Sequence, residues 1–168
     1  MADAQSEPNP VIEKLEEKDK TSAIAVAGHP LHAMSVHFPI ALVFGTLAVD
    51  VFYWWTADSF WLRVGLWTSG VAFFAGLAAG VVGTFELLLV AGIRARVASW
   101  AHAIAAIMLI SVAGANWGLR IGIGPEEAVL PHGMLLSCLA AVLTGVAGWH
   151  GGKLIFDHGI GLMVSSKD

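Results

Sequence analysis

The sequence has 168 residues, of which 57% are hydrophobic and 13% are charged, and its formal net charge is −4. A soluble domain is about 45–50% apolar and about 25% charged, so this composition excludes a disordered chain, a coiled coil and a secreted disulfide scaffold. The acidic balance argues against a nucleic-acid-binding protein, and the single cysteine, Cys138, excludes a disulfide within the chain. These figures indicate a membrane protein with enough length for about four helical spans of ~20 residues each.

The first 28 residues differ from the rest of the chain. Residues 1–20 contain six acidic residues and three lysines, which is typical of a solvated segment. No basic region is followed directly by an apolar core, so this segment does not have the pattern of a signal peptide. We therefore expect residues 1–28 to form a flexible soluble tail and residues 29–164 to form a transmembrane domain.

Four apolar runs follow, at residues 38–55, 61–90, 100–119 and 133–150. Each is close to or longer than ~18 residues, the length at which a spanning helix is the expected structure. Only helices and closed barrels satisfy their backbone polar groups in lipid, and these runs lack the alternation of barrel strands. Six of the seven tryptophans lie at the predicted span ends, where an indole ring meets the membrane interface. The sequence thus predicts an all-α integral membrane four-helix bundle with up-down-up-down topology.

The basic residues predict the orientation of this bundle. With the N-terminus in the cytoplasm, only Arg63 and Arg120 lie on the outer side. Seven basic residues lie on the inner side: Lys14, Lys18, Lys20, Arg94, Arg96, Lys153 and Lys167. Cytoplasmic loops carry an excess of Lys and Arg, so we expect both termini in the cytoplasm and the bundle in the inner membrane.

Small residues recur every fourth position on two of the predicted helices. The second helix carries Ala72, Gly76, Gly80 and Thr84, and the fourth carries Ala140, Thr144, Gly148 and Gly152. Such lines allow helices to approach closely in lipid, so they indicate packing within the bundle or docking to other subunits. Alternatively, a glycine on such a line could leave space for a flat macrocyclic cofactor.

Seven histidines are the most informative polar residues, because ionisable or ligating groups at membrane depth are rare and are functional candidates. They are His29, His32, His37, His102, His132, His150 and His158. With the predicted topology, all except His132 lie toward the cytoplasmic face. Taken singly, each of them could also be a hydrogen-bonded structural residue at a helix end.

Two motifs contain several of these histidines. The opening motif runs from Gly28 through His29-Pro-Leu-His32 and Val36-His-Phe-Pro-Ile-Ala41, and the closing motif runs from Gly151 to Gly161 and includes His158. Together they resemble a bacterial membrane family, domain of unknown function 2231, over about residues 28–164.

The resemblance also covers single positions in the spans. Asp50 and His102 match polar positions of the family, whereas Ala33 and Glu86 stand where the family usually has proline and aspartate. Some members resemble fusions to Rieske iron–sulfur or c-type cytochrome domains, so the resemblance implies membrane electron transfer. The chain lacks a Cys-x-x-Cys-His motif and therefore carries no covalent haem.

A b-type haem is the cofactor that two facing imidazoles would hold. Helices in direct contact are only ~8–10 Å apart, so the two ligands should come from diagonal helices, the first and the third. His37 and His102 lie on those helices near the same membrane face, and we predict that they bind the haem iron. A second haem would use His29 or His32 together with His150 or His158.

The predicted function is therefore that of an electron-transfer subunit that works with other membrane subunits, redox proteins or a quinone in the lipid bilayer. Such a subunit would not be an enzyme on its own, and no hydrolase or phosphoryl-transfer motif is present. A non-redox structural or assembly subunit of a larger complex is an alternative. A metal site formed by His29, His32, His37, His158 and Asp157 is another, because imidazole suits zinc, copper and iron.

Two carboxylates fall within the predicted spans. Asp50 lies 13 residues after His37, about 20 Å along a helix, and Glu86 lies near the inner end of the second helix. Either could relay protons or contact a quinol, and a proton or ion carrier that uses both is a further alternative. Each could also make a hydrogen bond between helices or reach the membrane interface.

Overall fold

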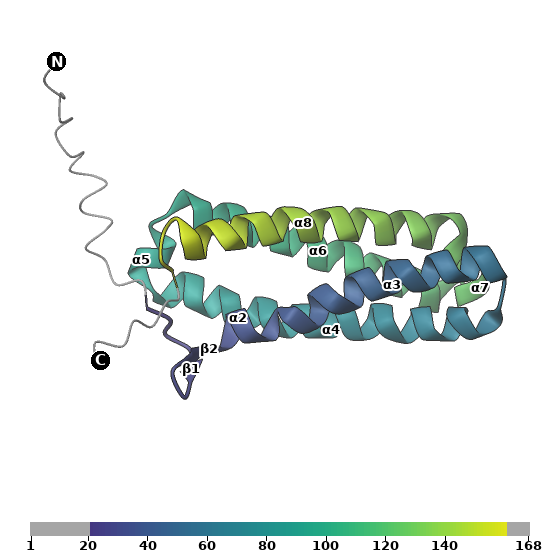
Figure 1. Cartoon of the computed structure of the whole chain (residues 1–168), viewed down its shortest axis with the longest axis horizontal. Coiled ribbons are helices and arrows are strands. Elements are labelled where there is room, and N and C mark those ends of the chain that lie inside the picture. The colour runs from purple at the N-terminus through teal and green to yellow at the C-terminus, as the bar shows by residue number, and fades with distance from the viewer. Residues whose placement is uncertain (1–20, 161–168) are drawn as a thin grey trace, which may run out of the picture.

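Four long apolar helices run antiparallel along a common axis (Figure 1). The computed structural model, which describes residues 21–160, contains α3 (His37–Thr56), α4 (Ser59–Leu89), α6 (Val97–Gly122) and α8 (Met134–Phe156). Extensive contacts join α3 to α4, α4 to α6, α6 to α8 and α8 to α3. The diagonal pairs are therefore α3 with α6 and α4 with α8, which confirms the predicted up-down-up-down bundle.

All four helices are long and apolar enough to cross a membrane. They extend beyond several predicted spans, most clearly α8, which continues from residue 150 to Phe156. Hydropathy marks the part of a helix that suits hydrocarbon, whereas the helix itself continues until its hydrogen-bonding pattern is interrupted. Polar residues such as Lys153 therefore lie within the helix although they lie outside the predicted span.

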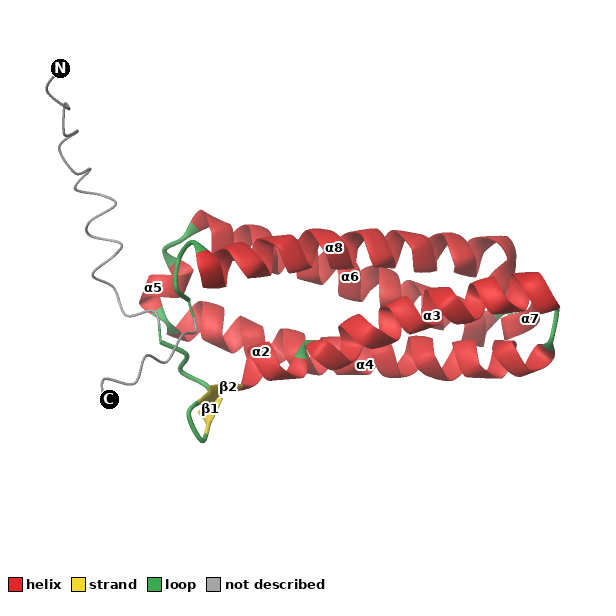
Figure 2. Ribbon diagram, in the orientation of Figure 1, coloured by secondary structure: helices red, strands yellow, loops and turns green. Residues whose placement is uncertain are grey.

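Short elements connect and cover the long helices (Figure 2). They are α2 (Leu31–Ser35), α5 (Ala91–Arg94), α7 (Pro125–Ala128) and a π-helical turn, η1 (Val129–Gly133). Strands β1 (Ala25–Val26) and β2 (His29–Pro30) pair as an antiparallel hairpin. Ala27 and Gly28 turn this hairpin with φ values of 49° and 79°, and positive φ at both turn residues is the geometry that matches strand twist.

The hairpin changes the interpretation of the predicted tail. Residues 21–28, which the sequence assigned to a flexible tail, include β1 and the buried Ser22. The remainder of that predicted tail, residues 1–20, lies outside the described residues.

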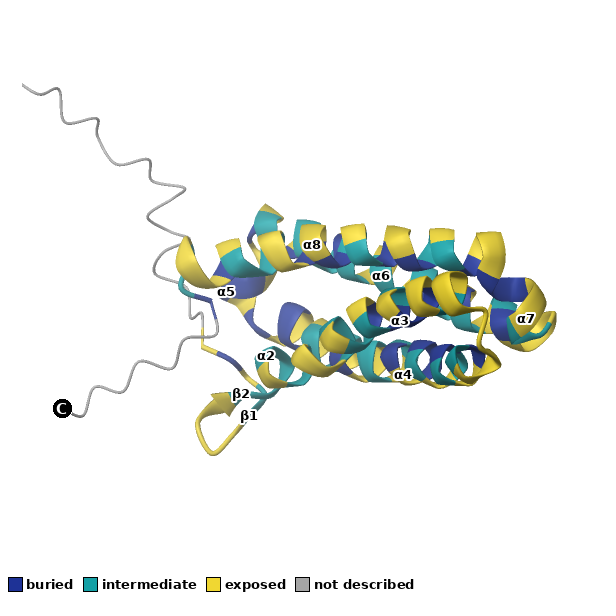
Figure 3. Ribbon diagram, turned by 45° about the vertical axis from the view of Figure 1, so that its right-hand side comes forward, coloured by how far each residue is buried: buried dark blue, intermediate teal, exposed yellow. Residues whose placement is uncertain are grey.

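Figure 3 shows exposed residues along the outer faces of the long helices. Many of these exposed residues are large and apolar, whereas many buried positions carry small or polar residues. Large side chains such as Trp67 and Leu135 are exposed, whereas Ala72 and Ala140 are each only 3% exposed. A water-soluble bundle would bury the large apolar side chains instead. This arrangement suits a lipid surround, in which close packing of small residues brings helices together.

Candidate functional site

The first helical hairpin (α2–α4) and the second helical hairpin (α6–α8) repeat one another along their inner faces. Six inner positions of α4 recur in the second hairpin 68 residues later, and five of them are identical. They are Gly65, Ser69, Ala72, Gly76, Ala79 and Gly83 on α4, followed by Gly133, Ser137, Ala140, Thr144, Ala147 and Gly151. In α2, α3 and α6 the repeat is 70 residues, and it relates His32 to His102 and Asp50 to Arg120.

These equivalent residues meet each other in the bundle. The rings of His32 and His102 face each other, and Asp50 forms an ion pair with Arg120. The Asp50–Arg120 contact crosses the diagonal between α3 and α6, and the histidine contact joins α2, which precedes α3, to α6. Contacts between equivalent residues place an approximate twofold axis along the bundle, and the two polar centres lie on it at different heights.

The first polar centre is the His32–His102 pair. The two ring centroids are 6.1 Å apart, and the ring planes cross at 77°. His32 belongs to α2, and His102 lies in the second turn of α6, so the two rings approach from opposite sides of the axis. Both side chains are partly buried.

Each imidazole is held by a carbonyl group of the neighbouring helix in its own hairpin. The Nδ1 atom of His32 lies 2.9 Å from the carbonyl oxygen of Ala79, and that of His102 lies 3.0 Å from the carbonyl oxygen of Ala147. A carbonyl oxygen can only accept, so each Nδ1 carries the proton. When such an imidazole is neutral, its lone pair is on Nε2, the atom through which it can bind a metal.

Glycines make room for both rings. A Cβ atom at Gly83 would lie 2.6 Å from the His32 ring, and one at Gly151 would lie 3.2 Å from the His102 ring. Each glycine follows its hydrogen-bonded alanine by four residues, so carbonyl and glycine lie one turn apart on one helix face. The groups that surround each histidine within its hairpin are thus the same in both hairpins.

The other histidines lie apart from this contact. His37, the predicted first-helix ligand, is exposed, and its Nδ1 donates to the carbonyl of Met34 at 3.1 Å. His29 is also exposed, and its Nδ1 donates to the carbonyl of Ala27. The ring that meets His102 is that of His32, which was predicted as a ligand of a second haem or of the alternative metal site, and not as the partner of His102.

The remaining histidines are distributed around the ends of the bundle. His150 is half-buried near the end of α8, His158 is half-buried beyond α8, and His132 is exposed. Within residues 21–160, no group of three or more His, Cys, Asp or Glu side chains is arranged to hold a metal ion. The alternative five-residue metal site is therefore not assembled there.

The second polar centre is a buried ion pair. Arg120 is 0% exposed and Asp50 is 1% exposed, and the Nη2 atom of Arg120 donates to Oδ2 of Asp50 at 2.7 Å. Ser137 donates to the same oxygen at 2.6 Å. Asn116 joins the network because it accepts from Nε of Arg120 at 3.0 Å and donates to Ser137 at 2.8 Å.

Arg120 was not identified as a site residue. It was counted among the basic residues on the outer side, but its side chain is buried in the bundle, where it pairs with Asp50. A charged group inside a membrane bundle is expected to pair in this way. Only Arg63 then remains as a basic residue on the side opposite the predicted cytoplasmic face.

Glu86, the other intramembrane carboxylate, lies at the histidine end of α4. It is 8% exposed and accepts a hydrogen bond from the hydroxyl of Ser22, whose oxygen in turn accepts from the backbone N–H of Ile24 at 3.3 Å. The contact fastens the segment before β1 onto the end of the bundle. Asp50 and Glu86 thus have separate partners, and their predicted contacts with protons or a quinol remain predictions.

Comparison with known families identifies the chain. Residues 28–163 match the model of a family described as predicted membrane protein, DUF2231. The chain belongs to this family. The matched region includes the opening motif, all four long helices and both polar centres. Searches of curated proteins and of solved structures gave no match.

This DUF2231 protein is therefore a multi-span membrane protein with two distinct centres on one axis. The histidine pair offers two imidazole rings, which suit a transition metal or a haem iron. The Asp50–Arg120 pair has its charges compensated within the bundle. Among the described residues, Oδ1 of Asp50 and Nη1 of Arg120 are buried without a hydrogen-bond partner, but only the histidine pair brings two imidazoles together.

Proposed function

We propose that this protein is a membrane electron-transfer subunit that binds one b-type haem through His32 and His102. The observation that carries the proposal is the contact between the two imidazoles. Both have their Nδ1 bonded to a carbonyl group and their Nε2 free for a metal. His32 takes the place of His37 because His37 is exposed and His32 contacts His102.

The spacing of the rings supports two ligands on one metal. An imidazole nitrogen binds a transition metal at about 2.0–2.1 Å, so two imidazoles that hold one metal must lie close together. The observed separation is 6.1 Å. The carbonyl groups of Ala79 and Ala147 would hold each ring in place and raise the basicity of its Nε2, as hydrogen-bond partners of ligating histidines do in metal sites.

A bound haem would supply one-electron chemistry, and the protein would supply its ligands and its surroundings. An apolar cluster closes the bundle near this end. Its buried members are Leu87, Val90, Ile93, Leu154 and Ile160. Low solvent access is one of the factors that set the reduction potential of a haem. The electron partners expected for such a subunit are other membrane redox proteins or a quinone.

A reduced-minus-oxidised absorption spectrum of the purified full-length protein, prepared with added haemin, tests the proposal. We expect the Soret and α bands of a six-coordinate b-type haem in the parent protein. His32→Ala and His102→Ala should each lose these bands, and His37→Ala serves as the matched control that keeps them. A parent protein without haem bands would refute the function.

The same variants test the choice of ligands separately. If the parent binds haem but His37→Ala loses it and His32→Ala retains it, the sequence-based pairing is right and the pairing proposed from the structure is wrong.

A further inference from the structure

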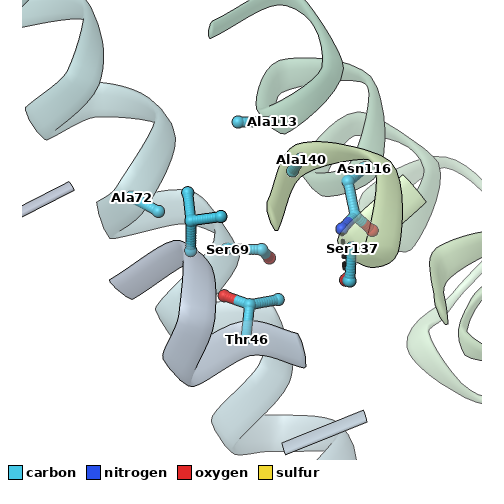
Figure 4. Close-up of a pocket in the computed structure, with 8 residues that line it drawn as sticks. Thr46, Ser69, Ala72, Ala113, Asn116, Ser137 and Ala140 are labelled. Atoms are coloured by element: carbon cyan, nitrogen blue, oxygen red, sulfur yellow. Dashed lines mark hydrogen bonds between the residues drawn. The ribbon is translucent and has the colours of Figure 1, made fainter. Parts of the chain in front are cut away.

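A small polar cavity lies at the centre of the bundle, between the histidine pair and the Asp50–Arg120 pair along the helices. Its volume is about 10 Å³, and it touches all four long helices (Figure 4). The residues that line it are Val43, Thr46, Ser69, Ala72, Ala113, Asn116, Ser137 and Ala140.

The walls of this cavity consist entirely of equivalent positions from the two hairpins. Val43 and Thr46 on α3 correspond to Ala113 and Asn116 on α6, at the 70-residue repeat. Ser69 and Ala72 on α4 correspond to Ser137 and Ala140 on α8, at the 68-residue repeat. The cavity is therefore on the approximate twofold axis, and it is the point where the four helices share one polar space.

The hydrogen-bonding groups in the cavity have unused capacity. The hydroxyl groups of Thr46 and Ser69 donate to carbonyl groups of their own helices, at 2.8 Å and 3.1 Å, so their oxygen lone pairs remain as acceptors. The amide nitrogen of Asn116 donates one of its two hydrogens to Ser137 and keeps the other. Figure 4 shows Thr46 and Ser69 on one side of the cavity, with Asn116 and Ser137 on the other side.

We propose that this cavity binds one water molecule. A cavity needs about 10–15 Å³ to hold a water, and a buried water typically makes about three hydrogen bonds. Here the water would donate to Thr46 and Ser69 and accept from Asn116. Two acceptors and one donor match the two hydrogens and a lone pair of one water, and the volume excludes any larger ligand.

The water would connect the two hairpins through their polar groups. The network of Asp50, Arg120, Asn116 and Ser137 has members on α3, α6 and α8. Ser69 is the polar wall residue contributed by α4, and its hydroxyl bonds only within its own helix. The bilayer core provides no alternative partners, so a water at this point extends the network to all four helices.

A crystal structure of the full-length protein, refined at a resolution that shows ordered solvent, tests the proposal. We expect one density peak within hydrogen-bond distance of Thr46, Ser69 and Asn116. Thr46→Val should remove the peak because it removes an acceptor, and Thr46→Ser, the matched control, should keep it. Ser69→Ala provides a second variant in case Thr46→Val does not fold.

Ordered side chains without density between them in the parent protein would overturn the proposal. It would also be overturned if the peak remained unchanged in both Thr46→Val and Ser69→Ala, since the water would then not depend on these hydroxyl groups.

Discussion

Exchange of Asp50 and Arg120 is a direct test of the approximate twofold relation between the hairpins. If the two positions are equivalent across the axis, an arginine at 50 and an aspartate at 120 should form the same ion pair with its direction reversed. The variants for this test are Asp50→Arg, Arg120→Asp and the double exchange that combines both substitutions. Each single variant places two like charges at a buried contact.

The expected magnitudes follow from the burial of this pair. The two side chains are 0% and 1% exposed and 2.7 Å apart, and removal of one partner from a buried ion pair costs about 3–5 kcal/mol. A like-charged pair costs at least as much, which is a large part of the roughly 5–15 kcal/mol that usually separates folded from unfolded protein. The double exchange should recover most of this loss.

A residual loss is expected in the double exchange because the polar neighbours are not symmetric. Ser137 has an identical equivalent in Ser69, but Asn116, which accepts from Arg120, corresponds to Thr46 at the 70-residue repeat. Hydrogen bonds to a charged group contribute about 1.5–3 kcal/mol each. We therefore expect the double exchange to remain about 1–3 kcal/mol less stable than the parent protein.

These three variants and the parent protein are compared in detergent. Size-exclusion chromatography measures how much folded protein each yields, and helical circular dichroism during heating measures its Tm. The single variants should yield little folded protein, and the double exchange should yield a monodisperse folded species with a moderately lower Tm. A double exchange that is as unstable as the single variants would show that positions 50 and 120 are not interchangeable, and the twofold argument would fail.

Two further predictions concern the histidine end of the bundle. Gly83→Ala should displace His32, since the new Cβ would lie 2.6 Å from the ring, so we expect a shifted or weakened haem absorption band with helical content unchanged. Gly145→Ala is its control because open space surrounds that position, and equal spectra for the two variants would contradict the role of Gly83. Ser22→Ala should free the segment before β1 from Glu86 at a cost of about 0.5–1.5 kcal/mol. Limited proteolysis should then cleave residues 21–30 faster, and an unchanged cleavage rate would show that other contacts hold this segment.

The fold could be predicted from the sequence because hydrocarbon restricts the possible structures. Four apolar runs without strand alternation leave helices as the solution, and short connections leave an antiparallel bundle. The ends of the helices could not be predicted as well. Hydropathy changes at the membrane interface, whereas α8 continues past it to Phe156.

The histidine site could be predicted only in part, because a ligand must point toward the bundle axis as well as lie at the right depth in the membrane. His102 and the diagonal arrangement were identified from the sequence, and His37 was chosen as the second ligand because it lies at the end of the first apolar run. His32 and His37 are five residues apart, so on one helix their side chains point about 140° away from each other. The structure turns His32 toward the axis and leaves His37 exposed.

The ion pair was missed because a single arginine near a span end resembles a loop charge. A signal for it is nevertheless present in the sequence. His32 precedes Asp50 by 18 residues and His102 precedes Arg120 by 18 residues. That shared spacing, together with the repeated inner faces of α4 and α8, is sufficient to pair position 50 with position 120.

The repeat also explains why the two centres on the axis must differ in chemistry. At the histidine end, equivalent positions carry the same residue, which is acceptable because two neutral imidazoles can bind one metal from opposite sides. At the other end, identical ionised residues would place two like charges in contact at 0–1% exposure, and such a contact opposes folding. A bundle of two identical hairpins would therefore have to leave this position uncharged. Because both hairpins belong to one chain, Asp50 and Arg120 can differ, and their pairing fixes how the hairpins that carry His32 and His102 lie against each other.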